Sequence, residues 1–205
     1  MRIKQRFNPN KIWFTSDCHF YHSGIINHVP RPFPDVETMN FCLIDAWNCY
    51  VPKDAIVFVL GDFAFTGSID KIKDLVSQLN GTIYLILGNH DIQSRYDRDV
   101  IKEIFGNRVY DVLEIEVNDA ENDFLPKKNT EDNFCKLFMS HYRHLEWNRG
   151  AIHIHGHHHS YLDRQLQFDP NTYDVGMDNN NWMPIDWYKL KEIIQYQNIN
   201  LKRKE

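Results

Sequence analysis

Short runs of apolar and β-branched residues recur along the chain, and each of them ends abruptly on polar groups. The runs are IWFTS, IVFVL, TIYLIL, KLFMS and AIHIH, which begin at residues 12, 56, 82, 136 and 151. Their length and composition are typical of buried strands, although periodicity alone does not separate a short apolar run from a buried helix. We therefore predict five strands whose last residues lead directly into polar turns.

Two segments between the first three runs have helical periodicity. Residues 38–50 form one of them. Residues 69–80 form the other, in which Ile72, Leu75 and Leu79 recur at helical spacing. The order strand, helix, strand predicts right-handed crossovers and parallel neighbouring strands. Because the carboxyl ends of parallel strands lie at one edge of a sheet, we expect the polar groups after the runs to form one shared site.

The second half of the chain adds three predicted elements. Residues 108–117 are expected to form one strand, residues 172–175 a late strand, and residues 187–197 a closing helix. With 205 residues the chain is long enough for one sizeable core, and neither a repeat nor a linker marks a second domain. We therefore expect a single domain that spans residues 1–205.

Composition and charge narrow the possible functions. The net charge of −5 gives no general basic surface for nucleic acid, so an anionic substrate needs local positive charge. No apolar stretch approaches the ~20 residues of a membrane helix, and no signal-peptide core follows the basic N-terminus. The four cysteines form neither a CxxC pair nor a disulfide framework. These features predict a cytoplasmic protein without a membrane partner.

The polar groups after the runs are suited to bind metal ions. They combine imidazole, carboxylate and amide oxygen without thiolate, which suits manganese, iron, zinc, cobalt or nickel better than a closed structural zinc site. The groups are Asp17, His19, Asp62, Asn89, His90, His141, His157 and His159. One ion rarely takes more than about six donors, so this number favours a pair of divalent ions about 3.5–4 Å apart. Such a pair would attract a phosphate.

The order of these groups resembles the signature of calcineurin-like metallophosphoesterases. The matching pieces are DCH, GDF, GNHD, the histidine after FMS, and GHHH, which follow one another between Ile12 and His159. The stretches FTSDCHFYHSGII and RPFP are similar to small bacterial and phage members. The resemblance implies an α/β fold, namely a layered αββα sandwich with two facing mixed sheets and a metal site at the carboxyl ends of the strands.

The resemblance also implies a role for each matched residue. The implied ligands of the first ion are Asp17, His19 and His159, and those of the second are Asn89, His141 and His157, with Asp62 bridging both. His90 matches the catalytic histidine, which approaches the phosphate from outside the metal shell and donates a proton or hydrogen bond to the leaving oxygen. Asp91 fits the motif as a residue that orients the site. Manganese is the expected metal for both positions.

Three further residues are candidate substrate contacts. Arg31 in RPFP and Arg143 after the KLFMS run each offer a guanidinium, whose fork can bind phosphate oxygens through two hydrogen bonds. His22 could reach the mouth of the site, and a contact within its own loop is an equal alternative.

Histidines inside the last apolar run have a less specific interpretation. His153 and His155 alternate along the strand before His157. We interpret them as outward polar positions or as supporting partners of the ligands, and a longer run of ligands is the alternative. His158 has no implied role.

Together these features predict a dinuclear metal-dependent phosphoesterase that hydrolyses phosphate esters with a metal-bridging hydroxide. Negative charge and aromatic residues on predicted loops favour a small nucleotide-like monoester or diester over duplex DNA. The alternatives are a nuclease of the same superfamily and a non-catalytic metal-binding scaffold that recruits protein partners. Retention of His90 together with every matched ligand position speaks against the scaffold.

Overall fold

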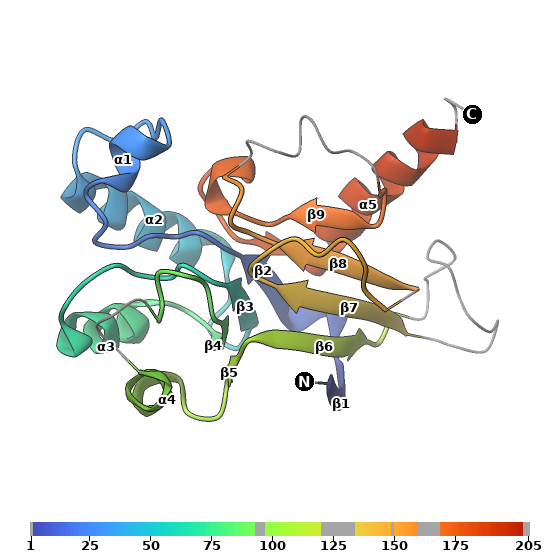
Figure 1. Cartoon of the computed structure of the whole chain (residues 1–205), viewed down its shortest axis with the longest axis horizontal. Coiled ribbons are helices and arrows are strands. Elements are labelled where there is room, and N and C mark those ends of the chain that lie inside the picture. The colour runs from blue at the N-terminus through green and yellow to red at the C-terminus, as the bar shows by residue number, and fades with distance from the viewer. Residues whose placement is uncertain (1, 93–96, 120–133, 149, 160–168, 203–205) are drawn as a thin grey trace.

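The computed structural model describes residues 2–92, 97–119, 134–148, 150–159 and 169–202. Within these residues the strands form two facing five-stranded sheets (Figure 1). The first sheet has the order β1 (Arg2–Phe7), β6 (Val112–Val117), β7 (Cys135–Ser140), β8 (Ala151–His155) and β9 (Thr172–Asp174). The second has the order β10 (Ile185–Asp186), β2 (Ile12–Thr15), β3 (Ile56–Leu60), β4 (Thr82–Ile86) and β5 (Val109–Tyr110).

The directions of the strands place their carboxyl ends where the sequence predicted a shared site. In the second sheet β2, β3, β4 and β5 run parallel, and β10 pairs antiparallel with β2. In the first sheet β7, β8 and β9 run parallel, whereas β6 pairs antiparallel with β7. Both sheets are therefore mixed, and the predicted α/β class with two facing mixed sheets is confirmed.

Local sequence sets the starts of the helices. The described helices are α1 (Ile25–His28), α2 (Val36–Tyr50), α3 (Ile69–Gln78), α4 (Arg98–Phe105), α5 (Trp187–Lys202) and the short 3-10 helices η1 (Pro9–Lys11) and η2 (Met177–Asn179). Asp35 caps α2, Ser68 caps α3 and Asp97 caps α4, each through a side-chain oxygen that accepts a main-chain N–H of the first turn. None of the described helices has the length and apolar character that crossing a bilayer requires.

The strand β3 shows why its sequence is a continuous apolar run. Val57 and Val59 belong to the hydrophobic cluster shared with α2, α3 and α4. Phe58 and Leu60 belong to a second cluster, which fills the space between the two sheets. Because both faces of the strand are buried, every position is apolar and only the end of the strand is polar.

The segment of residues 108–117 differs from the prediction. It forms two strands instead of one: β5 pairs with β4 in the second sheet, and β6 pairs with β1 and β7 in the first. The chain passes from one sheet to the other at Asp111. Apolar residues stand on both sides of Asp111 because both strands face hydrophobic clusters, so the pattern did not reveal the change of sheet.

Candidate metal centre

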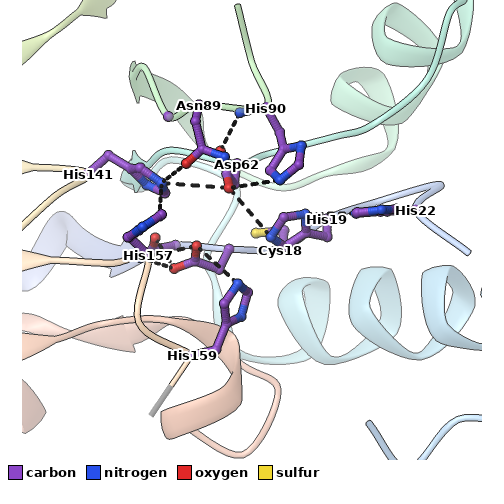
Figure 2. A network of polar contacts seen from close by, with 12 residues as sticks. Cys18, His19, His22, Asp62, Asn89, His90, His141, His157 and His159 are labelled. Atoms are coloured by element: carbon purple, nitrogen blue, oxygen red, sulfur yellow. Dashed lines mark hydrogen bonds and ion pairs between the residues drawn. The ribbon is translucent and has the colours of Figure 1, made fainter. Parts of the chain in front are cut away.

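Strand ends from both sheets bring the predicted ligands together (Figure 2). Asp17, Asp62 and Asn89 follow β2, β3 and β4 of the second sheet, and His141 and His157 follow β7 and β8 of the first. The main-chain N–H of His157 donates to both carboxylate oxygens of Asp17, at 3.1 and 2.9 Å. This pair of hydrogen bonds joins the two sheets at the site.

Asp62 occupies the middle of the cluster (Figure 2). Its Oδ2 lies 3.6 Å from Nε2 of His19 and 3.6 Å from Nε2 of His141. The resemblance assigns these two histidines to different ions. Asp62 therefore lies where a bridging carboxylate has to lie.

The donor atoms around His141 are arranged to receive a cation. Its Nδ1 lies 2.8 Å from the carbonyl oxygen of Leu60, so this nitrogen donates and Nε2 of the neutral ring carries a lone pair. Nε2 faces Oδ1 of Asn89 at 3.0 Å and Nδ1 of His157 at 3.2 Å. Two ligand atoms that each lie about 2.1 Å from one ion are about 3.0–3.4 Å apart in octahedral or tetrahedral geometry. The observed spacing fits a divalent metal.

The other predicted ligand set has a similar arrangement. Nε2 of His19 is buried without a hydrogen-bond partner, while its Nδ1 lies 3.2 Å from Nδ1 of His22. Asp17, His19 and His159 offer donor atoms that lie within 4.8 Å of one another. An unsatisfied buried nitrogen that faces a carboxylate and a second imidazole fits a metal ligand. The contact with His19 also supports the local alternative for His22.

The main chain at the ligands is strained. Among the described residues, five predicted ligands have backbone φ angles in the left-handed region, namely Asp17 (55°), His19 (52°), Asp62 (54°), His157 (73°) and His159 (46°). Residues other than glycine seldom adopt this conformation, and it is concentrated at functional sites, where the surrounding structure holds it.

Two glycines of the motifs leave room for the ligands. A Cβ atom at Gly88 would overlap the carboxylate of Asp62, and one at Gly61 would overlap the imidazole of His141. Gly61 also has a φ of +92°. Close approach of the main chain to the ligands explains why a glycine stands shortly after each of these two strands.

Burial shifts the pKa values of Asp62, His157 and His19 in the direction that favours their neutral forms. It raises the pKa of Asp62 to about 6, although His141 acts in the opposite direction. Burial lowers the pKa of His157 to about 4 and that of His19 well below its ordinary value. Neutral imidazoles are ready to bind a metal, and a divalent cation would offset the cost of burying ionised Asp62.

His90 lies beside this cluster with its side chain 26% exposed. Its main-chain N–H donates to Oδ1 of Asp62 at 2.8 Å, and its ring packs edge-on against Phe65. Its Nε2 lies 3.9 Å from Oδ2 of Asp62, and with His19 it forms a further group of potential metal donors. Proximity alone is therefore compatible with a ligand as well as with a proton donor, and the catalytic role of His90 stays a prediction.

The two candidate arginines have different surroundings. The guanidinium of Arg31 is buried behind the turn of Asp17, and all five of its N–H groups bond protein atoms. The predicted phosphate contact does not fit this geometry, because no donor is left for a ligand. Arg143 is half-buried, and its charge contributes to the lowered pKa values of His153 and His155. Its contact with substrate stays a prediction.

The histidines of β8 are not outward positions, because both His153 and His155 are fully buried. Nδ1 of His153 lies 3.2 Å from the carbonyl oxygen of Phe138, and its Nε2 accepts the main-chain N–H of His144 at 3.0 Å. The neutral ring is thereby satisfied at both nitrogens. Neither histidine belongs to the described groups that could hold a metal.

Asp178 is a polar residue of the site that the sequence did not reveal. Its Oδ2 lies 2.7 Å from Nδ1 of His159. It belongs to η2, after β9, and no motif spacing links it to the ligands.

Comparisons with known proteins agree with this geometry. The sequence model for "Calcineurin-like phosphoesterase" matches residues 10–194. The chain belongs to the calcineurin-like phosphoesterase family, and this membership implies metal-dependent hydrolysis of phosphate esters.

Alignments with individual relatives cover most of the chain. The chain is 32% identical over 189 residues to the uncharacterized protein MJ1445 of Methanocaldococcus jannaschii, and the alignment covers 90% of this chain and 92% of that protein. It is 30% identical over 181 residues to the Gene 66 protein of Mycobacterium phage L5, covering 81% and 86%. The crystal structure of protein AQ665 from Aquifex aeolicus matches with a TM-score of 0.60 at 20% identity, over 89% of this chain and 98% of that one. This last likeness supports the fold alone.

Proposed function

We propose that the chain is a dinuclear phosphoesterase that binds two divalent ions, with manganese as the preferred metal. The observation that carries the proposal is the position of Asp62, whose Oδ2 lies 3.6 Å from the imidazoles of both His19 and His141. The two histidines resemble ligands of separate ions, and a carboxylate between them can serve both. The proposal treats residues 1–205 as one domain, since both sheets supply strand ends to the site.

The residues of the chain would divide the chemistry between them. When bound, two divalent ions neutralise phosphate oxygens and lower the pKa of water. His90 would donate a proton to the leaving oxygen, while Asp91 would hold the turn that carries Asp62. Burial lowers the pKa of His90, and the negative charge of an approaching phosphate would act in the opposite direction. Binding of the phosphate would therefore favour the protonated form that the reaction needs.

The exposed side of the site favours a small nucleotide-like ester. Tyr142 is 49% exposed, and its ring lies 4.6 Å from the ring of His157. Its hydroxyl lies 3.4 Å from Oδ1 of Asn89. An aromatic ring at the mouth of a phosphate site can stack on a base, and the net charge of −5 disfavours long nucleic acids.

A cytoplasmic location is part of the proposal. The four cysteines Cys18, Cys42, Cys49 and Cys135 are all free thiols. Free thiols are typical of proteins that work in a reducing compartment. Cell fractionation of the tagged protein checks this part of the proposal.

The test combines metal analysis with a substrate panel. Purified protein loaded with manganese is assayed against model monoesters and diesters, nucleotides, cyclic nucleotides, and short DNA and RNA. We expect close to two ions per chain and turnover of small esters. Full activity with no more than one ion would contradict the dinuclear site. Turnover of DNA alone would favour the nuclease, and no turnover of any ester by the fully loaded protein would favour the scaffold.

A further inference from the structure

Arg31 and Asp178 form a buried ion pair directly behind the predicted ligands of the first ion. Nε of Arg31 donates to Oδ1 of Asp178 at 3.0 Å, and Nη2 donates to Oδ2 at 2.9 Å. The two side chains are 0% and 3% exposed. Two parallel hydrogen bonds of this kind fix the planes of both groups relative to each other.

The remaining donors of Arg31 hold the turn that carries two ligands. Nη2 donates to the carbonyl oxygen of Asp17 at 2.7 Å, and Nη1 donates to that of Cys18 at 3.0 Å. The last N–H points to Sδ of Met39 at 3.5 Å. Asp17 and His19 both have positive φ angles, so these carbonyl contacts stabilise a main-chain conformation that is otherwise unfavourable.

Asp178 contacts the third ligand of the same set. Its Oδ2, which accepts from Arg31, also accepts the Nδ1–H of His159 at 2.7 Å. The other ring nitrogen of His159, Nε2, then faces Oδ1 of Asp17 at 3.8 Å. A carboxylate that holds one N–H of an imidazole fixes the tautomer and the orientation of the ring, and leaves the second nitrogen free to bind a metal.

We propose that Arg31 and Asp178 are positioning residues for the first ion, acting through Asp17, His19 and His159. The inference rests on the proposed function, because it assigns these three residues to one metal. Loss of a partner behind metal ligands typically costs 10–100-fold in metal affinity. The second ion should be affected much less, because the side-chain hydrogen bonds of Arg31 and Asp178 within the described residues do not include Asn89, His141 or His157.

A purely stabilising role explains the pair less well. Two charges lose their hydration when they are buried, and replacing a buried pair with apolar side chains is often neutral for stability. The lost hydration of Arg31 and Asp178 is balanced by contacts with the main chain of the turn that carries Asp17 and His19 and with the ring of His159. Orientation of these predicted ligands accounts for that set of contacts, whereas stability alone does not.

The chain offers a matched control for the loss of a buried ion pair. Nζ of Lys191 lies 2.8 Å from Oδ2 of Asp119, and the two side chains are 15% and 6% exposed. Asp119 follows the carboxyl end of β6, which runs antiparallel to β7. It therefore lies at the end of the sheet opposite to His141. The variant Lys191→Met breaks a comparable pair far from the predicted metals.

The experiment measures manganese binding by calorimetry and metal content in folded wild type, Asp178→Asn and Lys191→Met. In Asp178→Asn we expect the affinity for one ion to fall by about 10–100-fold and the affinity for the other to stay near the wild-type value. In Lys191→Met we expect a lower melting temperature and two wild-type affinities.

Arg31→Lys provides a second, independent variant that keeps the positive charge. An ammonium has three donors and no planar fork, so it cannot reproduce five hydrogen bonds, and we expect the same selective loss of one ion. If both variants are folded and bind two ions with wild-type affinities, the positioning role is wrong although the dinuclear site stands. A wild-type protein that binds no manganese overturns the proposed function and, with it, this inference.

Discussion

Asp91 holds the turn that carries Asp62: its Oδ2 accepts the main-chain N–H of Asp62 at 2.9 Å. The same carboxylate accepts the main-chain N–H groups of Phe63 at 3.0 Å and Gly88 at 2.7 Å. Since Asp91 follows β4 and Asp62 follows β3, one buried side chain joins two neighbouring strand ends. These contacts support the orienting role that the sequence suggested for Asp91.

Asp91→Asn should therefore weaken metal binding and lower the free energy of unfolding. An amide offers one acceptor oxygen and turns its NH₂ group toward at least one of the three donors. Burial and the charge of Asp62 raise the pKa of Asp91 to about 6, so removing the charge relieves some repulsion. The cost of leaving one main-chain N–H without an acceptor should exceed this relief. The free energy of unfolding should therefore fall by about 1–3 kcal/mol.

Chemical denaturation and metal titration check this expectation. Asp45→Asn is the control, since Asp45 is exposed on α2 and should change stability by less than about 0.5 kcal/mol. An Asp91→Asn protein that is as stable as the control and binds manganese normally would show that the three hydrogen bonds are dispensable.

Asp62→Asn should weaken the binding of both ions, because the proposal gives both a share of this carboxylate. Asp17→Asn is the matched comparison, since Asp17 is a predicted ligand of the first ion alone. Elemental analysis and calorimetry should then find two weakened sites in the first variant and one in the second. The bridging role is excluded if Asp62→Asn lowers the affinity for only one ion.

The sequence predicted the position of the site because strand direction alone determines it. Runs such as IVFVL and TIYLIL mark buried parallel strands, whose carboxyl ends share one edge. The polar residue after each run therefore had to approach the others, whatever the details of packing. Ordered motifs could supply the identities of Asp62, Asn89 and His141 for the same reason.

Residues that act through other residues could not be predicted in this way. Arg31 is separated by 147 positions from its partner Asp178, and neither belongs to a strand-end motif. The sequence does not distinguish a loop arginine that binds a phosphate from one that binds main-chain carbonyl oxygens and a carboxylate. Only the folded chain brings the five donors of Arg31 to their acceptors.

His153 should make the stability of the metal-free protein depend on pH. Burial lowers its pKa to about 4, whereas the ordinary value of the unfolded chain is 6.5. Protonation would place a hydrogen on Nε2, which already accepts the N–H of His144. The neutral ring makes its full contribution to the free energy of unfolding above pH 6.5. About 3 kcal/mol of this contribution is lost as the pH falls from 6.5 toward 4.

Urea denaturation of wild type and His153→Gln between pH 7 and pH 4, with a chelator present, measures this contribution. The difference in stability between the two proteins should shrink by about 3 kcal/mol over this range. A difference for His153→Gln that stays constant over this pH range would mean that protonation of His153 is not coupled to folding.

His90 and His141 lie at similar distances from Asp62 Oδ2, 3.9 and 3.6 Å, and yet we expect their loss to have different effects. His141 is a predicted ligand with an Nδ1 fixed by Leu60, so His141→Ala should lower metal occupancy and be partly rescued by excess manganese. If His90 acts on the leaving oxygen, His90→Ala should keep its metal and its fold. Its turnover alone should fall, by about 10²–10⁴-fold.

Substrates with different leaving groups separate proton donation from other roles of His90. A good leaving group departs without protonation. The defect of His90→Ala should therefore be small for an ester with a good leaving group and large for an ester with a poor one. Metal content is measured on the same samples, because His90 also lies in a group of potential metal donors with His19 and Asp62. A His90→Ala protein that loses manganese as readily as His141→Ala would make His90 a ligand. One that hydrolyses a poor leaving group at the wild-type rate would leave His90 without a part in the reaction.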